Sequence, residues 1–339
     1  MTHRFDPRNL QVGDVLLYHS NALISRTICL LDGAKVSHAA IYLGPDRIGE
    51  ALMDQGLVAR KQQASFDQHD WVEVRRIKAP NLDLSPVCLV AERYLAQHNR
   101  YAYEQILLLG GICLTRKLDF DNPLIRLIAQ KAMAAADAVV QQMSDEGKQP
   151  MICSEFVFRD YDEARPELDD PYTLTILSQQ SAAPRRRFSW LREVQGIAGP
   201  TGLGGAPGMH PESLLAGLEK RLATLEVIPP PSAARRMAES FGDLDQLLQQ
   251  FLAGDQSRTP AAPPNSHETG RRQLEPTALR FARTLAAVMP KSETDGRATT
   301  GSLAAASPGE RMRAAVADFV TPGDLDVSPS LVTMGTILV

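Results

Sequence analysis

Three short segments of the sequence contain residue types that together can carry out acyl chemistry. They contribute His38, Glu50 and Cys153, in that order. A cysteine becomes a strong nucleophile once it loses its proton, and a nearby imidazole can take that proton. A carboxylate can in turn hold the imidazole in the tautomer that acts as a base. The three side chains are therefore candidates for nucleophile, base and orienting acid.

Cys153 lies where a helix is expected to begin. Pro150 disfavours helical backbone at the residue before it, and the apolar residues from 152 to 164 then follow one helical face. Backbone N–H groups at the start of a helix favour a thiolate and can donate to a developing oxyanion. The other cysteines lie in apolar helical patterns and are expected to be buried filler; they are Cys29, Cys88 and Cys113.

His38 and Glu50 are expected on two neighbouring strands joined by a Gly-Pro-Asp turn. Side chains alternate between the faces of a strand, so the length of the loop decides whether the two residues share a face. An odd loop, for example three residues between Leu43 and Arg47, places them on one face with Leu52 opposite His38. A two-residue loop places them on opposite faces.

Other residues near the turn compete for these roles. Asp46 and Asp54 are alternatives to Glu50 as the orienting group. Tyr18 could line the cleft or assist the oxyanion, although an aromatic residue at a strand end more often serves packing. Asp14 is expected to form a turn rather than to act as a catalytic acid.

A zinc ion bound by His38, Glu50 and Cys153 is chemically allowed, because a catalytic zinc needs only three protein ligands. The sequence has no close ligand pair of the usual kind, however. We therefore expect neither a metal nor an organic cofactor.

The elements that must position these residues change character along the chain. The first 80 residues are β-rich, with one early helix at 21–31 and strands expected at 12–18, 36–43, 48–53, 57–60 and 71–77. Helical patterns follow at 86–118, with a break near Asn99, at 123–143 and from Cys153 onward. The pattern indicates an α+β fold, with a small, mostly antiparallel sheet packed on helices.

Beyond residue 181 the composition shifts. The basic run 185–187 and the tract 254–270, rich in small and polar residues, are expected to be linkers, because they bury too little apolar surface to offset the entropy of ordering. Amphipathic stretches within residues 210–255 are expected to form short helices that dock on a surface or on a partner protein. Residues 319–339 are expected to form a turn, a short helical turn and a strand that returns to the core.

Charge and hydropathy exclude several classes of function. The chain has 36 Lys and Arg against 40 Asp and Glu, so its net charge of -4 provides no field that would gather nucleic acid. The longest apolar run, residues 106–114, is about half the ~20 residues that cross a bilayer as a helix. The N-terminus lacks the apolar stretch of a secretory signal. We expect a cytoplasmic protein with no transmembrane segment and no nucleic-acid partner.

In their order and context, these motifs resemble the permuted papain-like amidases of the YaeF/YiiX type, which are relatives of the NlpC cell-wall peptidases. That family has an early Gly-Asp strand, a Ser-His strand, a Glu-Ala pair and a late Cys-Ser-Glu helix start. This sequence matches these motifs at Gly13-Asp14, Ser37-His38, Glu50-Ala51 and Cys153-Ser154-Glu155. The resemblance implies that Cys153 is the nucleophile, His38 the base and Glu50 the third member.

The resemblance also implies a domain organisation and a reaction. Residues 8–180 would form the first part of a papain-like catalytic domain, residues 181–315 an insertion, and residues 316–339 the C-terminal return. The reaction would be hydrolysis of an amide or ester bond in a peptide, amide or acyl-lipid substrate. Two alternatives stay open. One is an acyltransferase or thioesterase like the relatives of lecithin:retinol acyltransferase, and the other is a catalytically silent binding module that uses the 210–255 helices.

Overall fold

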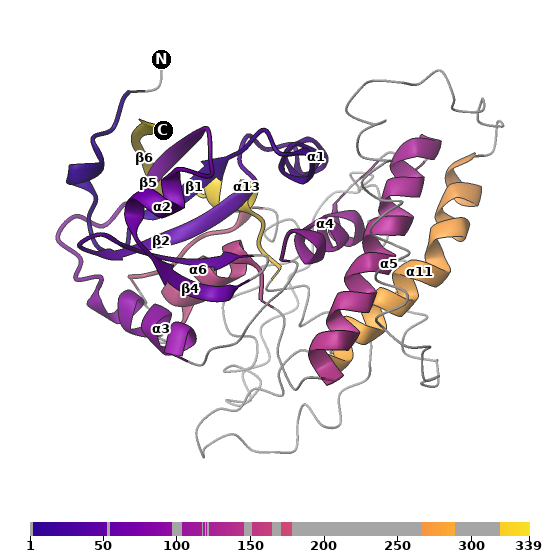
Figure 1. Ribbon diagram of the computed structural model, residues 1–339. Helices are drawn as coiled ribbons and strands as arrows, with labels where there is room; N and C mark the ends of the chain where they lie inside the picture. Colours follow the sequence, from indigo (N-terminus) through magenta and orange to yellow (C-terminus); the bar gives the residue numbers. More distant parts are fainter. Residues whose placement is uncertain are drawn as a thin grey trace, which may run out of the picture.

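The computed structural model describes residues 3–52, 55–96, 104–116, 118, 120, 122–145, 151–164, 171–177, 266–288 and 319–339. This part of the chain is a mixed α+β structure in which a six-stranded antiparallel sheet packs with helices (Figure 1). The expected α+β class, with a small antiparallel sheet, is confirmed.

The sheet is built from two distant parts of the chain. Its strands are β1 (Val15–His19), β2 (His38–Gly44), β3 (Arg47–Leu52), β4 (Gly56–Arg60), β5 (Trp71–Ile77) and β6 (Leu331–Leu338). Their order across the sheet is β4-β3-β2-β1-β5-β6. The C-terminal strand β6 pairs with β5, so the end of the chain completes a sheet that begins near the N-terminus.

The described ranges contain one 3-10 helix and several α-helices. They are the 3-10 helix η1 (Pro7–Asn9) and the α-helices α1 (Leu23–Asp32), α2 (Gln62–Phe66), α3 (Ser85–Ala96), α4 (Glu104–Thr115), α5 (Pro123–Asp145), α6 (Cys153–Asp162), α11 (Ser266–Val288) and α13 (Pro322–Asp326). The long helices α5 and α11 lie side by side, and α4 contacts both α5 and α1 (Figure 1). None of the helices in these ranges combines the length and apolar character needed to cross a bilayer.

Helix α11 contradicts one expectation. It begins at Ser266, so the prediction that all of residues 254–270 form a linker is wrong for the last five. The helix is stabilised by its later turns, where Leu274 and Phe281 are buried in the apolar core and Thr284 Oγ1 donates to Asp137 Oδ1 of α5 at 2.5 Å. Tertiary packing of this kind outweighs the low helix propensity of the first turns. The 210–255 helices and the basic run 185–187 lie outside the described residues.

Strand alternation divides the buried side chains between the two faces of the sheet. On one face, Ile41 belongs to a large apolar cluster that includes Phe156 of α6. On the other face, Ala40 and Ile48 belong to a smaller cluster that includes Phe66 of α2. Helix α6 contacts β2 and β3 directly, and α2 contacts β3. The sheet is therefore a layer between α6 and α2.

Candidate active site

The register of β2 and β3 places His38 and Glu50 on the same face of the sheet. Glu50 pairs with Ala40, which is the register that an odd loop requires. The loop itself has only two residues, because Gly44 pairs with Arg47. A β-bulge in β2 just before Gly44 supplies the additional residue and restores the parity.

The two residues form a buried pair. His38 Nε2 lies 3.2 Å from Glu50 Oε2, and the side chains are 4% and 0% exposed. Burial by itself raises the pKa of the Glu50 carboxyl, but the His38 hydrogen bond and the charges of His38 and Arg60 outweigh burial and lower the pKa below its usual value. An ionised Glu50 accepts the Nε2 proton. The nitrogen of His38 that can serve as a base is therefore Nδ1.

Glu50 has two further donors. Arg60 of β4 donates to Oε1 at 3.2 Å, and Ser65 Oγ of α2 donates to Oε2 at 3.3 Å. The hydroxyl of Tyr18 lies 2.8 Å from Ser65 Oγ. Burial raises the pKa of Tyr18 far above its usual value, so its hydroxyl keeps its proton and donates to Ser65. Each oxygen of this fully buried carboxylate is thus hydrogen-bonded.

The ring of His69 stacks on the ring of His38. Its ring is parallel to that of His38 within 7°, with 5.8 Å between centroids, and its Nδ1 lies 3.0 Å from the Ser65 carbonyl oxygen. Burial, reinforced by the charge of His38, lowers the pKa of His69 to about 4. His69 is neutral above that pH, and its Nδ1–H donates to the carbonyl.

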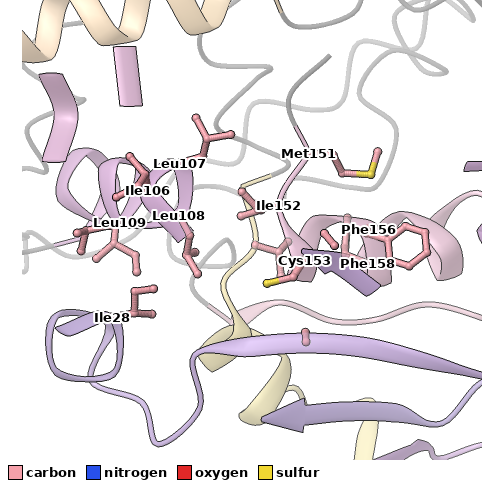
Figure 2. Close-up of a cluster of buried hydrophobic side chains, with 14 of the residues drawn as sticks. Ile28, Ile106, Leu107, Leu108, Leu109, Met151, Ile152, Cys153, Phe156 and Phe158 are labelled. Carbon is pink, nitrogen blue, oxygen red and sulfur yellow. The ribbon is translucent and has the colours of Figure 1, made fainter. Parts of the chain in front are cut away.

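Cys153 is the first residue of α6. The preceding residue, Ile152, has extended backbone and caps the helix without a side-chain hydrogen bond. Figure 2 shows the side chain of Cys153 leaving the first turn of the helix, with its sulfur directed away from Met151 and toward the strand that follows α1. The residue is 1% exposed. The start of α6 is fixed by Ser154 Oγ, which donates to the Val320 carbonyl at 2.6 Å.

Helix α6 runs along β2 in the same direction. Tyr161, near its end, donates to the Gly13 carbonyl at 2.5 Å, and the N–H of Gly13 donates to the Tyr42 carbonyl at 2.8 Å. The end of α6 therefore lies beside the end of β2. Eight helical residues span about 12 Å and four strand residues about 13 Å. Cys153 consequently lies toward the end of β2 that begins with His38.

The other cysteines differ from Cys153 in position. Burial raises the pKa of the Cys29 and Cys88 thiols to about 11 and that of Cys113 to about 12. These thiols stay protonated near neutral pH. Cys113 is buried as expected, whereas Cys29 and Cys88 are only partly buried, so the expectation of buried filler is wrong for these two. None of the four cysteines forms a disulfide in the described part of the chain.

The alternative site residues take structural roles where the structure describes them. Asp46 has a positive φ of 57° in the turn and accepts a hydrogen bond from the N–H of Gln62. Asp14 is buried and binds the guanidinium of Arg76 with both oxygens, at 2.6 and 2.7 Å. Asp54 lies outside the described residues. No group of three metal-ligating side chains in the described ranges could hold a metal ion.

Sequence reasoning missed Arg60, Ser65 and His69. Arg60 pairs with Ile48 on β3 and so shares a face with Glu50, a relation that follows from alternation once the β3–β4 register is known. Ser65 and His69 depend on α2 and the turn after it, which have no motif in the sequence. Only the fold brings these two residues to Glu50.

One hollow in the described part of the chain lies apart from these residues. It has a volume of about 550 Å³ and lies between the loop after α1 and helix α13, where Lys35, Arg116 and Asp326 line it.

Comparison of the chain with protein-family models, curated proteins and solved structures finds no match. The function is therefore inferred from the residues and their geometry.

Proposed function

We propose that this protein is a cysteine hydrolase with a permuted papain-like catalytic unit, which cleaves an amide or ester bond through Cys153. The observation that carries this proposal is the buried His38–Glu50 pair at the end of β2 toward which the start of α6 lies. Its arrangement matches the roles of a base and its orienting carboxylate. A histidine buried only for packing has no need of an ionised partner.

The proposed reaction requires His38, the first residue of β2, and Cys153, the first residue of α6, to meet at this end of the sheet. His38 Nδ1 takes the proton of the Cys153 thiol, and the thiolate attacks the carbonyl carbon of the substrate. N–H groups at the start of α6 stabilise the oxyanion. The imidazolium then gives its proton to the leaving amine or alcohol, and a thioester remains on Cys153. Water, deprotonated by Nδ1, releases the carboxylic acid and restores the thiol.

A second candidate, acyl transfer, is favoured by the surroundings of the thiol. Cys153 belongs to an apolar cluster with Ile28, Leu108 and Ile152 (Figure 2). Such walls restrict water, so an amine or alcohol acceptor could compete with hydrolysis of the thioester. Product analysis with and without an added amine separates the two reactions, since only transfer yields a new amide.

Thiol alkylation tests the nucleophile with a control matched in burial. Cys113 is 0% exposed and Cys153 is 1% exposed, so a difference in their rates reports thiolate content rather than access. We expect iodoacetamide to label Cys153 at least ~10-fold faster than Cys113 at neutral pH, because Cys153 begins a helix and His38 serves as its base in the proposed reaction. His38→Ala should remove most of that advantage.

The outcomes separate clearly when labelling is followed by peptide mass spectrometry. Equal rates for Cys153 and Cys113, unchanged by His38→Ala, would overturn the hydrolase proposal. Cys153→Ala should in addition lower turnover of an activated ester by ~10³-fold or more, because the covalent route is lost. Cys113→Ala should leave turnover unchanged.

A further inference from the structure

For His38 to act as a base, the buried Glu50 carboxylate beside it must stay ionised even while the imidazole is neutral. During the proposed reaction His38 alternates between imidazole and imidazolium, so for part of the cycle it offers Glu50 no positive charge. Glu50 is fully buried, and a buried anion without a partner takes up a proton instead. With that additional proton the pair is either Glu50 carboxylate with imidazolium or Glu50 carboxyl with an Nδ1–H imidazole. In both forms Nδ1 carries a proton and cannot act as a base.

Arg60 supplies the missing charge. Its NH1 lies 3.2 Å from Glu50 Oε1, on the oxygen that His38 does not use. The guanidinium is itself held in place, because NH2 donates to the Ala64 carbonyl at 2.5 Å and NH1 also reaches Gln68 Oε1 at 3.2 Å. Its side chain is only 16% exposed, so solvent screens the pair weakly. The arginine is present whether or not His38 is protonated.

The hydroxyl groups of Tyr18 and Ser65 also stabilise the ionised form of Glu50, through its other oxygen. Tyr18 donates to Ser65, and Ser65 donates to Glu50 Oε2, the oxygen that also accepts from His38. Both donors favour a carboxylate over a carboxyl group. The hydroxyls carry no charge, however, and Ser65 lies at 3.3 Å. Arg60 is therefore the stronger of the two influences.

We propose that Arg60 is a positioning residue for the reaction: it holds Glu50 ionised and oriented in both protonation states of His38, so that Nε2 keeps its proton and Nδ1 stays the base. This assignment rests on the proposed function, because Nδ1 acts as a base only in that reaction. Arg60 itself touches neither the thiol nor a substrate in this scheme.

The titratable and charged groups around the pair come from several elements. Tyr18 of β1 stays protonated, and His69, after α2, stays neutral above about pH 4. Cys153 begins α6. Removing Cys153 eliminates the thiol that exchanges a proton with His38 in the proposed reaction. Arg60 and Glu50 then remain as the charges that set the behaviour of the imidazole.

NMR titration of the His38 imidazole in a Cys153→Ala background tests the role of Arg60 without requiring any catalysis. We expect Arg60→Gln to raise the pKa of His38, because it removes a like charge and leaves Glu50 uncompensated. Glu50→Gln should shift it in the opposite direction, because it removes the anion. Arg60→Lys should stay close to the parent, and Ser65→Ala should shift the pKa the same way as Arg60→Gln but by less.

The control is another arginine of the same hairpin. Arg47 on β3 forms an exposed ion pair with Glu92. Arg47→Gln therefore changes the net charge by the same amount as Arg60→Gln, but at a position away from the site. It should leave the titration of His38 unchanged. Should Arg60→Gln fail to fold, Ser65→Ala still reports the direction in which the loss of a donor to Glu50 shifts the pKa of His38.

With Cys153 restored, Arg60→Gln should lower kcat for an activated ester ~10-fold at neutral pH with little change in KM, and activity should recover as the pH rises. Arg60→Lys should rescue it. The inference is overturned if Arg60→Gln leaves the His38 titration where it is or shifts it in the same direction as Glu50→Gln. An unreactive Cys153 with the expected titration shifts would instead overturn the hydrolase proposal alone.

Discussion

The two faces of the sheet bury different kinds of side chain. Toward α6, Ile41 packs with Phe156 in an apolar cluster. Toward α2, four neighbouring strands contribute polar side chains that are linked to one another; they are Tyr18, His38, Glu50 and Arg60. The same strands build both faces, because alternate residues point in opposite directions.

The two faces are therefore expected to contribute differently to the stability of the protein and to the protonation of its side chains. Apolar burial on the α6 face lowers the free energy of the folded state without requiring specific partners. On the α2 face each buried polar group must find a hydrogen bond, and its protonation state depends on its neighbours. We therefore expect substitutions on the α6 face to act mainly on the free energy of unfolding, and those on the α2 face to act mainly on its pH dependence.

The largest effect is expected on the apolar face. Phe156 is fully buried and packs against Gly49 of β3 and the ring of Tyr94. Phe156→Ala should lower the free energy of unfolding by about 3–5 kcal/mol, because it removes buried surface and leaves a cavity. Urea unfolding followed by circular dichroism measures this change.

Phe156→Leu is the matched variant, since it keeps most of the apolar volume. It should cost clearly less than Phe156→Ala. If the alanine variant lost no more than about 1 kcal/mol, α6 would not be held to the sheet by this face, and the contrast between the faces would fail.

An intermediate effect is expected on the polar face in acid. The pKa of His69 is lowered to about 4 by burial and by the charge of His38, whereas in the unfolded chain it is ordinary, near 6.5. The unfolded chain therefore binds the proton first, and stability is lost as the pH falls from about 6.5 toward 4. His69→Gln should reduce that loss by about 2 kcal/mol, allowing for partial exposure.

Unfolding measured at pH 8 provides the internal control, because His69 is neutral there in both states. Any difference between the two proteins at pH 8 reports packing alone and is subtracted. Parallel curves from pH 8 to pH 4 would show that His69 is not the source of the acid sensitivity.

The smallest effect concerns an exception on the α6 side, a buried acid within α6 itself. Asp160 is fully buried, and neither of its carboxylate oxygens has a hydrogen-bond partner in the described part of the chain. Burial, reinforced by the charge of Glu163, raises its pKa well above the usual value. The folded chain thus keeps a proton that the unfolded chain releases, so stability falls as the pH rises from about 4 through the folded pKa.

Asp160→Asn should therefore make the protein more stable at pH 8, by about 1 kcal/mol, and should flatten the decline with pH. Asp67→Asn, at an exposed position in the turn after α2, is the control and should change neither. A lower stability of Asp160→Asn at pH 8 would mean that the carboxyl group has a stabilising role in the fold.

Much of the sheet could be predicted from local patterns. The strand at Trp71–Ile77 agrees with its expectation at both ends, and the start of α6 agrees at Cys153. Alternating and periodic apolar residues determine such elements because each faces a core on at least one side. The α+β class follows from their order along the chain.

The details that decide the site could not be read in the same way. The turn between β2 and β3 has two residues, and only the bulge before Gly44 keeps His38 and Glu50 on one face. A bulge depends on the twist and pairing of both strands, so no single segment encodes it. Helix α11 likewise depends on burial of Phe281 beside α5 rather than on its own first turns.

The sequence by itself determined the candidate residues: a cysteine at a helix start, a histidine on a strand and a glutamate on the next. Residue type and short-range periodicity suffice for that, because they act within a few residues. The tertiary structure alone decided that Glu50 is fully buried and that Arg60 and Ser65 are its partners. Contacts of this kind depend on strand register and helix docking, which arise only when distant segments pack together.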